Sequence, residues 1–247
     1  MRRRLLPLAL LLLLAAGPAW AENPAECRVA ENLTEPSFKL PQVTRALAAK
    51  RLTILVVGAG SSQLPSGNAY PSRLQHALAE QLRGVDVKVT TDVKSGRTAS
   101  EMVKTLPAAL NANKPDLLVW QTGTVDAMLG VDPDQFSQAL DKGIKFAHAA
   151  GADVVLINAQ YSPRTESMIA LGTYVEDMRW VALQQEVPLF DRFSIMKLWG
   201  ELGTFDLYSA TKKLDIAERV HDCIGRLLAD LIITAAKPVE PPTNGSR

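Results

Sequence analysis

The amino-acid sequence predicts one α/β domain in which helices cover both faces of a five-stranded, mostly parallel sheet. Short β-branched apolar runs alternate five times with segments of helical periodicity along the 247-residue chain. The apolar runs show little polar alternation, as expected for strands buried on both faces. No internal repeat or linker interrupts residues 50–236. These features favour a single three-layer α/β/α domain with a substantial core.

The first 21 residues have the pattern of a secretory signal peptide. Arg2–Arg4 are basic, Leu5–Ala16 is almost purely apolar, and Ala19–Ala21 places small residues where a signal peptidase requires them. The apolar run is shorter than the ~20 residues of a spanning helix, which favours cleavage over a membrane anchor. We therefore expect cleavage near Ala21, a periplasmic or secreted protein, and no stable membrane insertion afterwards.

The predicted elements follow the leader in chain order. Residues 22–50 are a polar lead-in with a short helix near 43–50, and residues 51–236 are the folded domain. The apolar runs predict strands at 52–57, 85–89, 116–120, 153–157 and 187–190. Helical periodicity predicts helices at 70–82, 98–110, 133–150, 165–186, shortly after 192, and 215–235. Residues 237–247, rich in proline and polar residues, are expected to be a disordered tail.

Two of these helices carry start signals. Thr98 with Glu101, and Asp215 with Glu218, have the spacing of a capping box. Pro133 opens a third helix, as proline does at a first helical position.

Charge and cysteine content limit the possible partners. The chain has 27 Lys and Arg residues, of which three lie in the leader, and 26 Asp and Glu residues. After cleavage no basic surplus remains to bind nucleic acid. Cys27 and Cys223 predict a disulfide in an exported chain, with two separately buried thiols as the alternative. Two cysteines and three histidines without ligand spacing predict no zinc site, and we expect no cofactor.

Polar segments follow four of the predicted strands, and the first three of these segments contain glycine. In parallel sheets the ligand site lies beyond the carboxyl ends of the strands, so the segments after the first three strands and the loop 203–213 before the last helix are candidates for the site. The four polar segments are Gly58–Gln63, Lys94–Thr98, Gln121–Ala127 and Asn158–Pro163.

The arrangement resembles the SGNH (GDSL-type) hydrolases, which cleave esters of carbohydrates, lipids and small acyl compounds. Their first block is Gly-Asp-Ser at the end of strand one; Gly60, Ser61 and Ser62 occupy this place, so the resemblance implies Ser62 as the nucleophile. Their second block matches 95–98 and implies that Gly96 donates a backbone N–H to an oxyanion hole. The fold class is then the SGNH-hydrolase or flavodoxin-like arrangement.

The sequence departs from the pattern of this family in two places. The third block, Gly-x-Asn-Asp, falls on 123–126 with Val125 in place of the oxyanion asparagine. The last block, Asp-x-x-His, falls on 204–209, which contains Asp206 and no histidine. His221 in the last helix is the remaining candidate base, with Asp206 or Asp215 behind it, and packing beside Cys223 is the alternative role.

Three functions are compatible with these residues. The first is an exported serine esterase or acyl hydrolase that acts on ester-linked acyl groups of a glycan, a lipid or a small molecule. The second is a catalytically inactive SGNH-like domain that binds such a ligand or a partner protein. The third, a dinucleotide-binding domain, rests on Gly58 and Gly60, but Gln63 stands where the third glycine is required.

Overall fold

The structure is a computed structural model that describes residues 23–208 and 213–237. Its five strands, β1 (Arg51–Gly58), β2 (Asp86–Val93), β3 (Leu117–Gln121), β4 (Asp153–Ile157) and β5 (Leu189–Phe190), form one sheet in the order β2-β1-β3-β4-β5. All four strand pairs are parallel. The sheet confirms the predicted α/β class. The predicted signal peptide and most of the tail lie outside the described residues.

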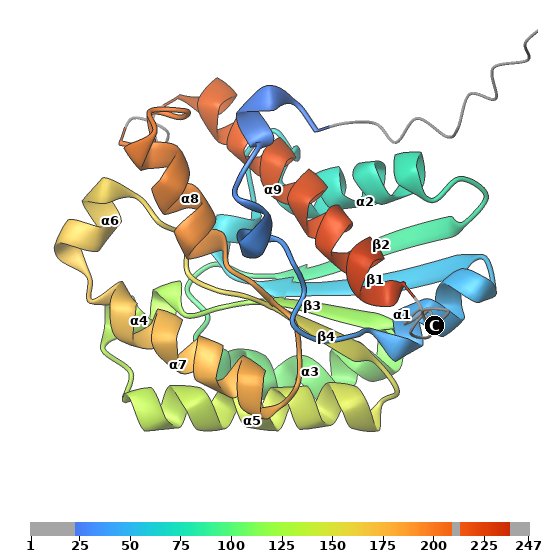
Figure 1. The fold of residues 1–247 in the computed structure, drawn as a ribbon. Coiled ribbons are helices and arrows are strands. Elements are labelled where there is room, and N and C mark those ends of the chain that lie inside the picture. The colour runs from blue at the N-terminus through green and yellow to red at the C-terminus, as the bar shows by residue number, and fades with distance from the viewer. Residues whose placement is uncertain (1–22, 209–212, 238–247) are drawn as a thin grey trace, which may run out of the picture.

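Helices cover both faces of the sheet (Figure 1). One face carries α1 (Pro41–Ala48), α2 (Tyr70–Gln81) and α9 (Leu214–Ala236), and the other carries α3 (Ala99–Asn113), α5 (Pro133–Ala149) and α7 (Leu171–Gln184). The remaining elements are η1 (Ala25–Cys27), η2 (Glu31–Leu33), η3 (Gly60–Ser62), α4 (Thr124–Leu129), α6 (Pro163–Met168) and α8 (Arg192–Glu201).

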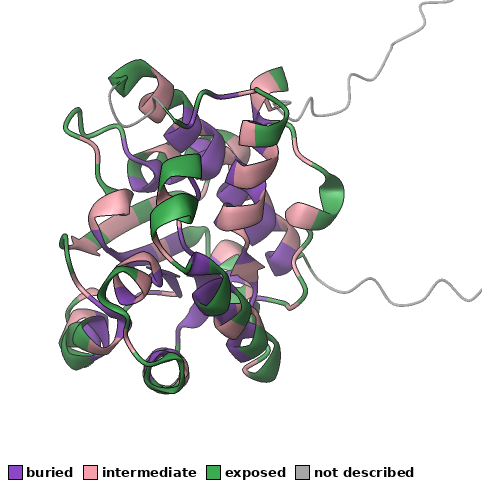
Figure 2. Ribbon diagram, turned by 90° about the vertical axis from the view of Figure 1, so that its left-hand side faces the viewer, coloured by how far each residue is buried: buried purple, intermediate pink, exposed green. Residues whose placement is uncertain are grey.

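The alternation of side chains along β1 divides the core between these two layers. Leu52, Ile54 and Val56 belong to the cluster under α2 and α9, whereas Leu55 and Val57 belong to the cluster on the opposite face. Successive side chains of a strand point to opposite faces, so a strand that is apolar throughout needs helices on both sides. Figure 2 shows the result, with buried residues concentrated in the strands and on the helix sides that face them.

Two long-range contacts hold the last helix in place. The predicted disulfide between Cys27 and Cys223 is present and joins η1 to α9. Helices α2 and α9 pack closely at Gly225, where a Cβ would lie 2.8 Å from the backbone nitrogen of Leu74. Within the described ranges no helix has the length and the hydropathy needed to cross a bilayer.

The predicted helix at 165–186 is divided into two. Ile169 is extended, with φ −138° and ψ 133°, and ends α6 before α7 begins at Leu171. The break allows Ile169 and Leu171 to pack in one cluster with Ala159 and Phe193, which a continuous helix would not permit. The prediction of a capping box at Asp215 was also wrong, because α9 begins after Lys213 without a side-chain cap and Glu218 accepts a hydrogen bond from Asn68.

Candidate functional site

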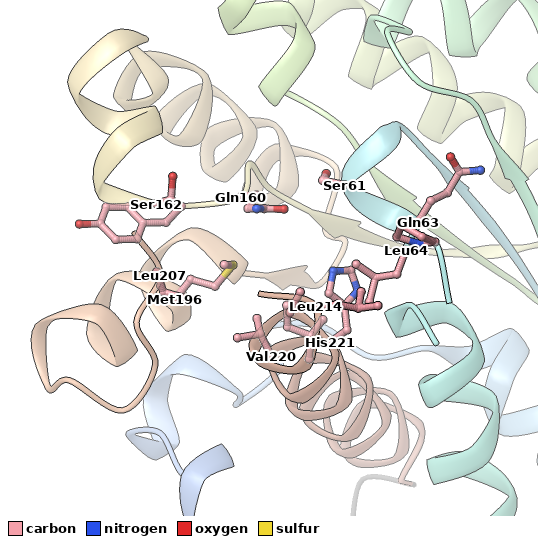
Figure 3. A pocket seen from close by; sticks show the side chains of 14 residues that line it. Ser61, Gln63, Leu64, Gln160, Ser162, Met196, Leu207, Leu214, Val220 and His221 are labelled. Carbon is pink, nitrogen blue, oxygen red and sulfur yellow. The ribbon is translucent and has the colours of Figure 1, made fainter. Parts of the chain in front are cut away.

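A cavity of about 460 Å³ lies beyond the carboxyl ends of the central strands, bordered by the segments after β1 and β4 and by α8 and α9 (Figure 3). Its wall is largely apolar, with a small polar set at the strand ends. The apolar residues are Leu64, Pro65, Met196, Leu207, Leu214, Ala217, Val220 and Ile224. The polar or amphipathic residues are Ser61, Gln63, Gln160, Tyr161, Ser162 and His221. The cavity occupies the position where the sequence predicts the site.

Ser62 is buried, with 2% of its surface exposed, and it opens toward a different cavity. Its hydroxyl donates to Oε1 of Gln121 at 2.5 Å and lies 3.2 Å from the Tyr70 hydroxyl. The cavity that Ser62 borders, of about 590 Å³, shares the residues 63–65 with the first one, so this loop separates the two. Ser62 is therefore held by an amide and a phenol, neither of which is a general base at neutral pH.

His221 lies at the wall of the first cavity and is 7% exposed. Its Nδ1 accepts the backbone N–H of Tyr70 at 2.9 Å. A neutral imidazole with Nδ1 as acceptor carries its proton on Nε2, so Nε2 is a donor. An aspartate behind Nδ1, as predicted for Asp206 or Asp215, would need that nitrogen to carry a proton instead. Burial first, and then the nearby Arg192, lower the pKa of His221 to about 4, so the ring is neutral at pH 7.

Arg192 is a buried cation behind the polar end of the cavity. It is 1% exposed, and its guanidinium donates to the carbonyl and the hydroxyl of Ser61 at 3.5 and 3.4 Å. Its Nε is buried and has no hydrogen-bond partner among the described residues. Burial lowers the pKa of Arg192 to about 10. The charge is retained at neutral pH, so this end of the cavity has a positive potential.

The neighbouring Asp191 is bound by groups other than Arg192. Asp191 caps α8 through the Ser194 N–H, accepts from the Asn158 amide at 2.6 Å, and pairs with Arg179 at 2.6 Å. The Asp191 carboxylate therefore accepts hydrogen bonds from these groups and is not a counter-ion of Arg192. Hydrogen bonds from these partners, Arg179 first, hold the pKa of Asp191 below its usual range despite its burial.

The second and third motif blocks are joined by Asp126. Its carboxylate accepts the Ala99 N–H at 2.9 Å and the Thr122 hydroxyl at 3.2 Å, which fixes the start of α3 against the end of β3. The capping box of Thr98 and Glu101 is present, and burial raises the pKa of Asp126. Gly96, at φ 77°, is exposed ahead of this helix start. Asp126 is thus a structural residue that links two loops at the site edge.

The end of β1 permits a second register for the first motif block. The strand ends at Gly58, so the block Gly-Asp-Ser can also be placed on Gly58, Ala59 and Gly60. In this register the nucleophile position is Gly60, which has no hydroxyl. A Cβ at Gly60 would lie 2.9 Å from the hydroxyl of Ser95, in the second block. This contact places Gly60 next to the loop that carries Gly96.

The structure brings some of the predicted residues together and adds others. Ser62 and His221 are linked only indirectly, through the side chain and the backbone of Tyr70. Asp206 is exposed in the loop after α8, whose residues 209–212 lie outside the described part of the chain. Sequence reasoning did not find Gln121 or the buried state of Arg192. A glutamine that ends an apolar strand is the signal that could have identified the first of these.

Fold, cavity position and motif blocks together define an SGNH-type α/β protein. The chain belongs to the Non-GDSL lipase-like family, whose model matches residues 26–238. The family description agrees with a first block that departs from Gly-Asp-Ser.

Two curated relatives are esterases. The chain is 35% identical over 114 residues to "Esterase TesA" of Pseudomonas aeruginosa, which is 45% of this chain and 56% of the relative. It is 33% identical over 113 residues to "Arylesterase" of Vibrio mimicus, which is 44% of this chain and 56% of that protein. The matches therefore span about half the length of these relatives.

Solved structures that are similar to this chain have the same fold. A crystal structure of TesA is 28% identical, with a TM-score of 0.58, covering 72% of this chain and 99% of the other. A two-domain esterase active on acetylated mannans is 12% identical, with a TM-score of 0.68, covering 87% of this chain and 59% of the other. At 12% identity the second likeness concerns the fold alone.

Proposed function

We propose that this chain is an exported acyl-ester hydrolase that takes the ester-linked acyl group of a glycan, a lipid or a small molecule into the cavity beside His221. The observation that carries the proposal is the cavity itself, whose largely apolar wall also presents hydroxyl and imidazole groups at the carboxyl edge of the sheet. Esterase relatives support the reaction class. The disulfide between Cys27 and Cys223 supports folding outside the cytoplasm.

The cavity residues can bind an acyl ester whether or not they hydrolyse it. The apolar wall of Leu64, Met196 and Ile224 suits an acyl chain, because burying each methylene contributes about 0.8 kcal/mol. Nε2–H of His221 is a donor for the ester carbonyl. This part of the proposal does not depend on which serine reacts.

Hydrolysis also needs a nucleophile, and two adjacent serines are candidates. Ser62 is the residue that the family motif implies, and its attack requires it to leave the hydrogen bond to Gln121. Ser61 shares the cavity with His221, and the guanidinium of Arg192 near its hydroxyl favours the alkoxide form. Gly96 is proposed to donate its N–H to the oxyanion.

A specific observation favours a second candidate function, which is ligand binding without turnover. A general base must accept a proton, and the Nδ1 bond to Tyr70 leaves the proton of His221 on Nε2. Val125 cannot replace the donor that this family has at its position, and loss of one such donor typically costs ~100–1,000-fold in turnover. In this case the cavity binds the same ester-linked acyl ligand and releases it unchanged.

Covalent labelling distinguishes the two candidates. The oxidised protein without its leader is treated with a fluorophosphonate, and the modified residue is mapped by mass spectrometry. Turnover of 4-nitrophenyl acetate and octanoate is measured in parallel. A hydrolase gives labelling at Ser61 or Ser62 and loss of turnover in the corresponding alanine variant. Ser167→Ala, an exposed serine on α6, is the matched control.

The alternative outcome has an equally clear signature. A folded protein that is neither labelled nor active, but whose melting temperature rises with 4-nitrophenyl octanoate, is a binding domain. Absence of labelling, turnover and any thermal shift with acyl esters would reject the acyl-ester site altogether.

A further inference from the structure

Arg192 carries a buried positive charge for which the described residues supply no carboxylate partner. Among the described residues its guanidinium donates hydrogen bonds to Ser61 alone, and both are long at 3.5 and 3.4 Å. The adjacent Asp191 is bound to Arg179, Asn158 and the start of α8. The phenol of Tyr70 interacts electrostatically with Arg192, but burial raises the pKa of this phenol, so it stays neutral. A buried charge without a counter-ion is costly, and a bound anion would offset that cost.

The hydrogen bonds of the Arg192 guanidinium connect it to the polar end of the cavity through Ser61. Ser61 lies between the guanidinium and the cavity, since its hydroxyl accepts from Nη2 while the residue lines the wall. A hydroxyl that accepts from a cation can donate its own proton to an acceptor on its other side. Nε2–H of His221 is a second donor in the same wall. Two donors and one buried positive charge therefore converge on one end of an apolar cavity.

We propose that this cavity selects an amphiphilic monocarboxylate, with the carboxylate bound by Ser61 and His221 in the field of Arg192 and the chain along the apolar wall. A single charge suits the site because, among the described residues, Arg192 is the cation that hydrogen-bonds to the polar end of the cavity, and His221 is neutral. The inference rests on the proposed function, because a carboxylate is the acid product of acyl-ester hydrolysis. It adds that binding is selective for charge and that Arg192 determines this selectivity.

The test compares octanoate with 1-octanol, which has the same chain length and no charge. Binding to the oxidised protein is measured by calorimetry at pH 7 for the wild type, for Arg192→Met and for the control Lys145→Met. Lys145 is an exposed cation on α5 that pairs with Asp141, so its loss changes the net charge equally without touching the cavity wall. A carboxylate roughly 6 Å from the Arg192 guanidinium, at an effective dielectric constant of about 20, corresponds to a preference for octanoate over octanol on the order of 10- to 100-fold.

We expect this preference for octanoate in the wild type and in Lys145→Met, and a ratio near one in Arg192→Met. Equal binding of octanoate and octanol to the wild type would overturn the inference and leave the acyl cavity intact. A preference that survives in folded Arg192→Met would also overturn it.

Ser61→Ala decides the matter if Arg192→Met does not fold. Removal of the hydroxyl is expected to weaken the binding of octanoate at least fivefold and to leave the binding of octanol unchanged. Equal weakening of the binding of both ligands would contradict the inference. If neither ligand nor 4-nitrophenyl octanoate binds to the folded wild type, the proposed function itself fails.

Discussion

Replacement of His221 by asparagine removes a buried ionisable group while keeping its main hydrogen bond. In His221→Asn the side-chain oxygen takes the place of Nδ1 as acceptor of the Tyr70 N–H. His221 lies on α9 and faces Tyr70 of α2 and Arg192 of α8. The variant therefore tests whether burial and the charge of Arg192 resist protonation of this ring.

The sign of the effect follows from the direction of the pKa shift. In the folded state the pKa of His221 is about 4, whereas its ordinary value is 6.5. Between these values the unfolded chain binds a proton that the folded protein refuses, so acid favours unfolding. The contribution is fully present above pH 6.5 and is lost as the pH falls toward 4. At about 1.4 kcal/mol per pKa unit the loss is about 3 kcal/mol.

The assay is urea unfolding of the oxidised wild type and of His221→Asn at four pH values from 7.5 to 4. Between pH 7.5 and pH 4 the free energy of unfolding of the wild type should fall by about 3 kcal/mol relative to that of His221→Asn. Asp126 and Asp153 have raised pKa values and titrate in the opposite sense, but they are present in both proteins and cancel in the difference. A difference that stays constant from pH 7.5 to 4 would refute the assigned burial of His221.

Three further predictions concern stability. Arg192→Met should raise the free energy of unfolding at pH 7 by up to about 3–4 kcal/mol, because burial lowers the pKa of this cation to about 10, and urea unfolding measures the gain. Gly225→Ala should cost about 1–3 kcal/mol, because its Cβ would meet the backbone of α2, whereas Gly172→Ala, in open space on α7, should be neutral or stabilising. Thermal unfolding with and without a reductant should show that the Cys27–Cys223 bond contributes about 2–5 kcal/mol; unchanged stability would contradict its structural role.

The sheet was predictable because its strands carry their own signal. Each central strand is a short apolar run bounded by polar or glycine residues, and residues buried on both faces must be apolar whatever packs on them. The break at Ile169 was not predictable, because the apolar periodicity continues across it. It is set by contacts with Ala159 and Phe193, which come from two other segments.

The position of the site was predictable, but its contacts were not. The rule that ligands bind beyond the carboxyl ends of parallel strands placed Ser61, Gln160 and Ser162 at one edge. The bond between Tyr70 and His221 joins residues 151 positions apart, and no local pattern predicts it. Arg192 opens a helix after a strand, a place where a charged residue is usually solvated.

Arg192 and His221 share a property that separates them from the rest of the core. Burial shifts the pKa of each against its charged form, so neither is the side chain that stability alone would favour. Both sheet faces are already covered by apolar clusters. Arg192 and His221 instead lie at the polar end of the same cavity, one behind Ser61 and one in its wall. Charged or ionisable side chains that destabilise a fold and lie together at a cavity are best explained by a ligand that they bind. Ligand binding at the polar end of this cavity is therefore the part of the proposed function with the strongest physical support.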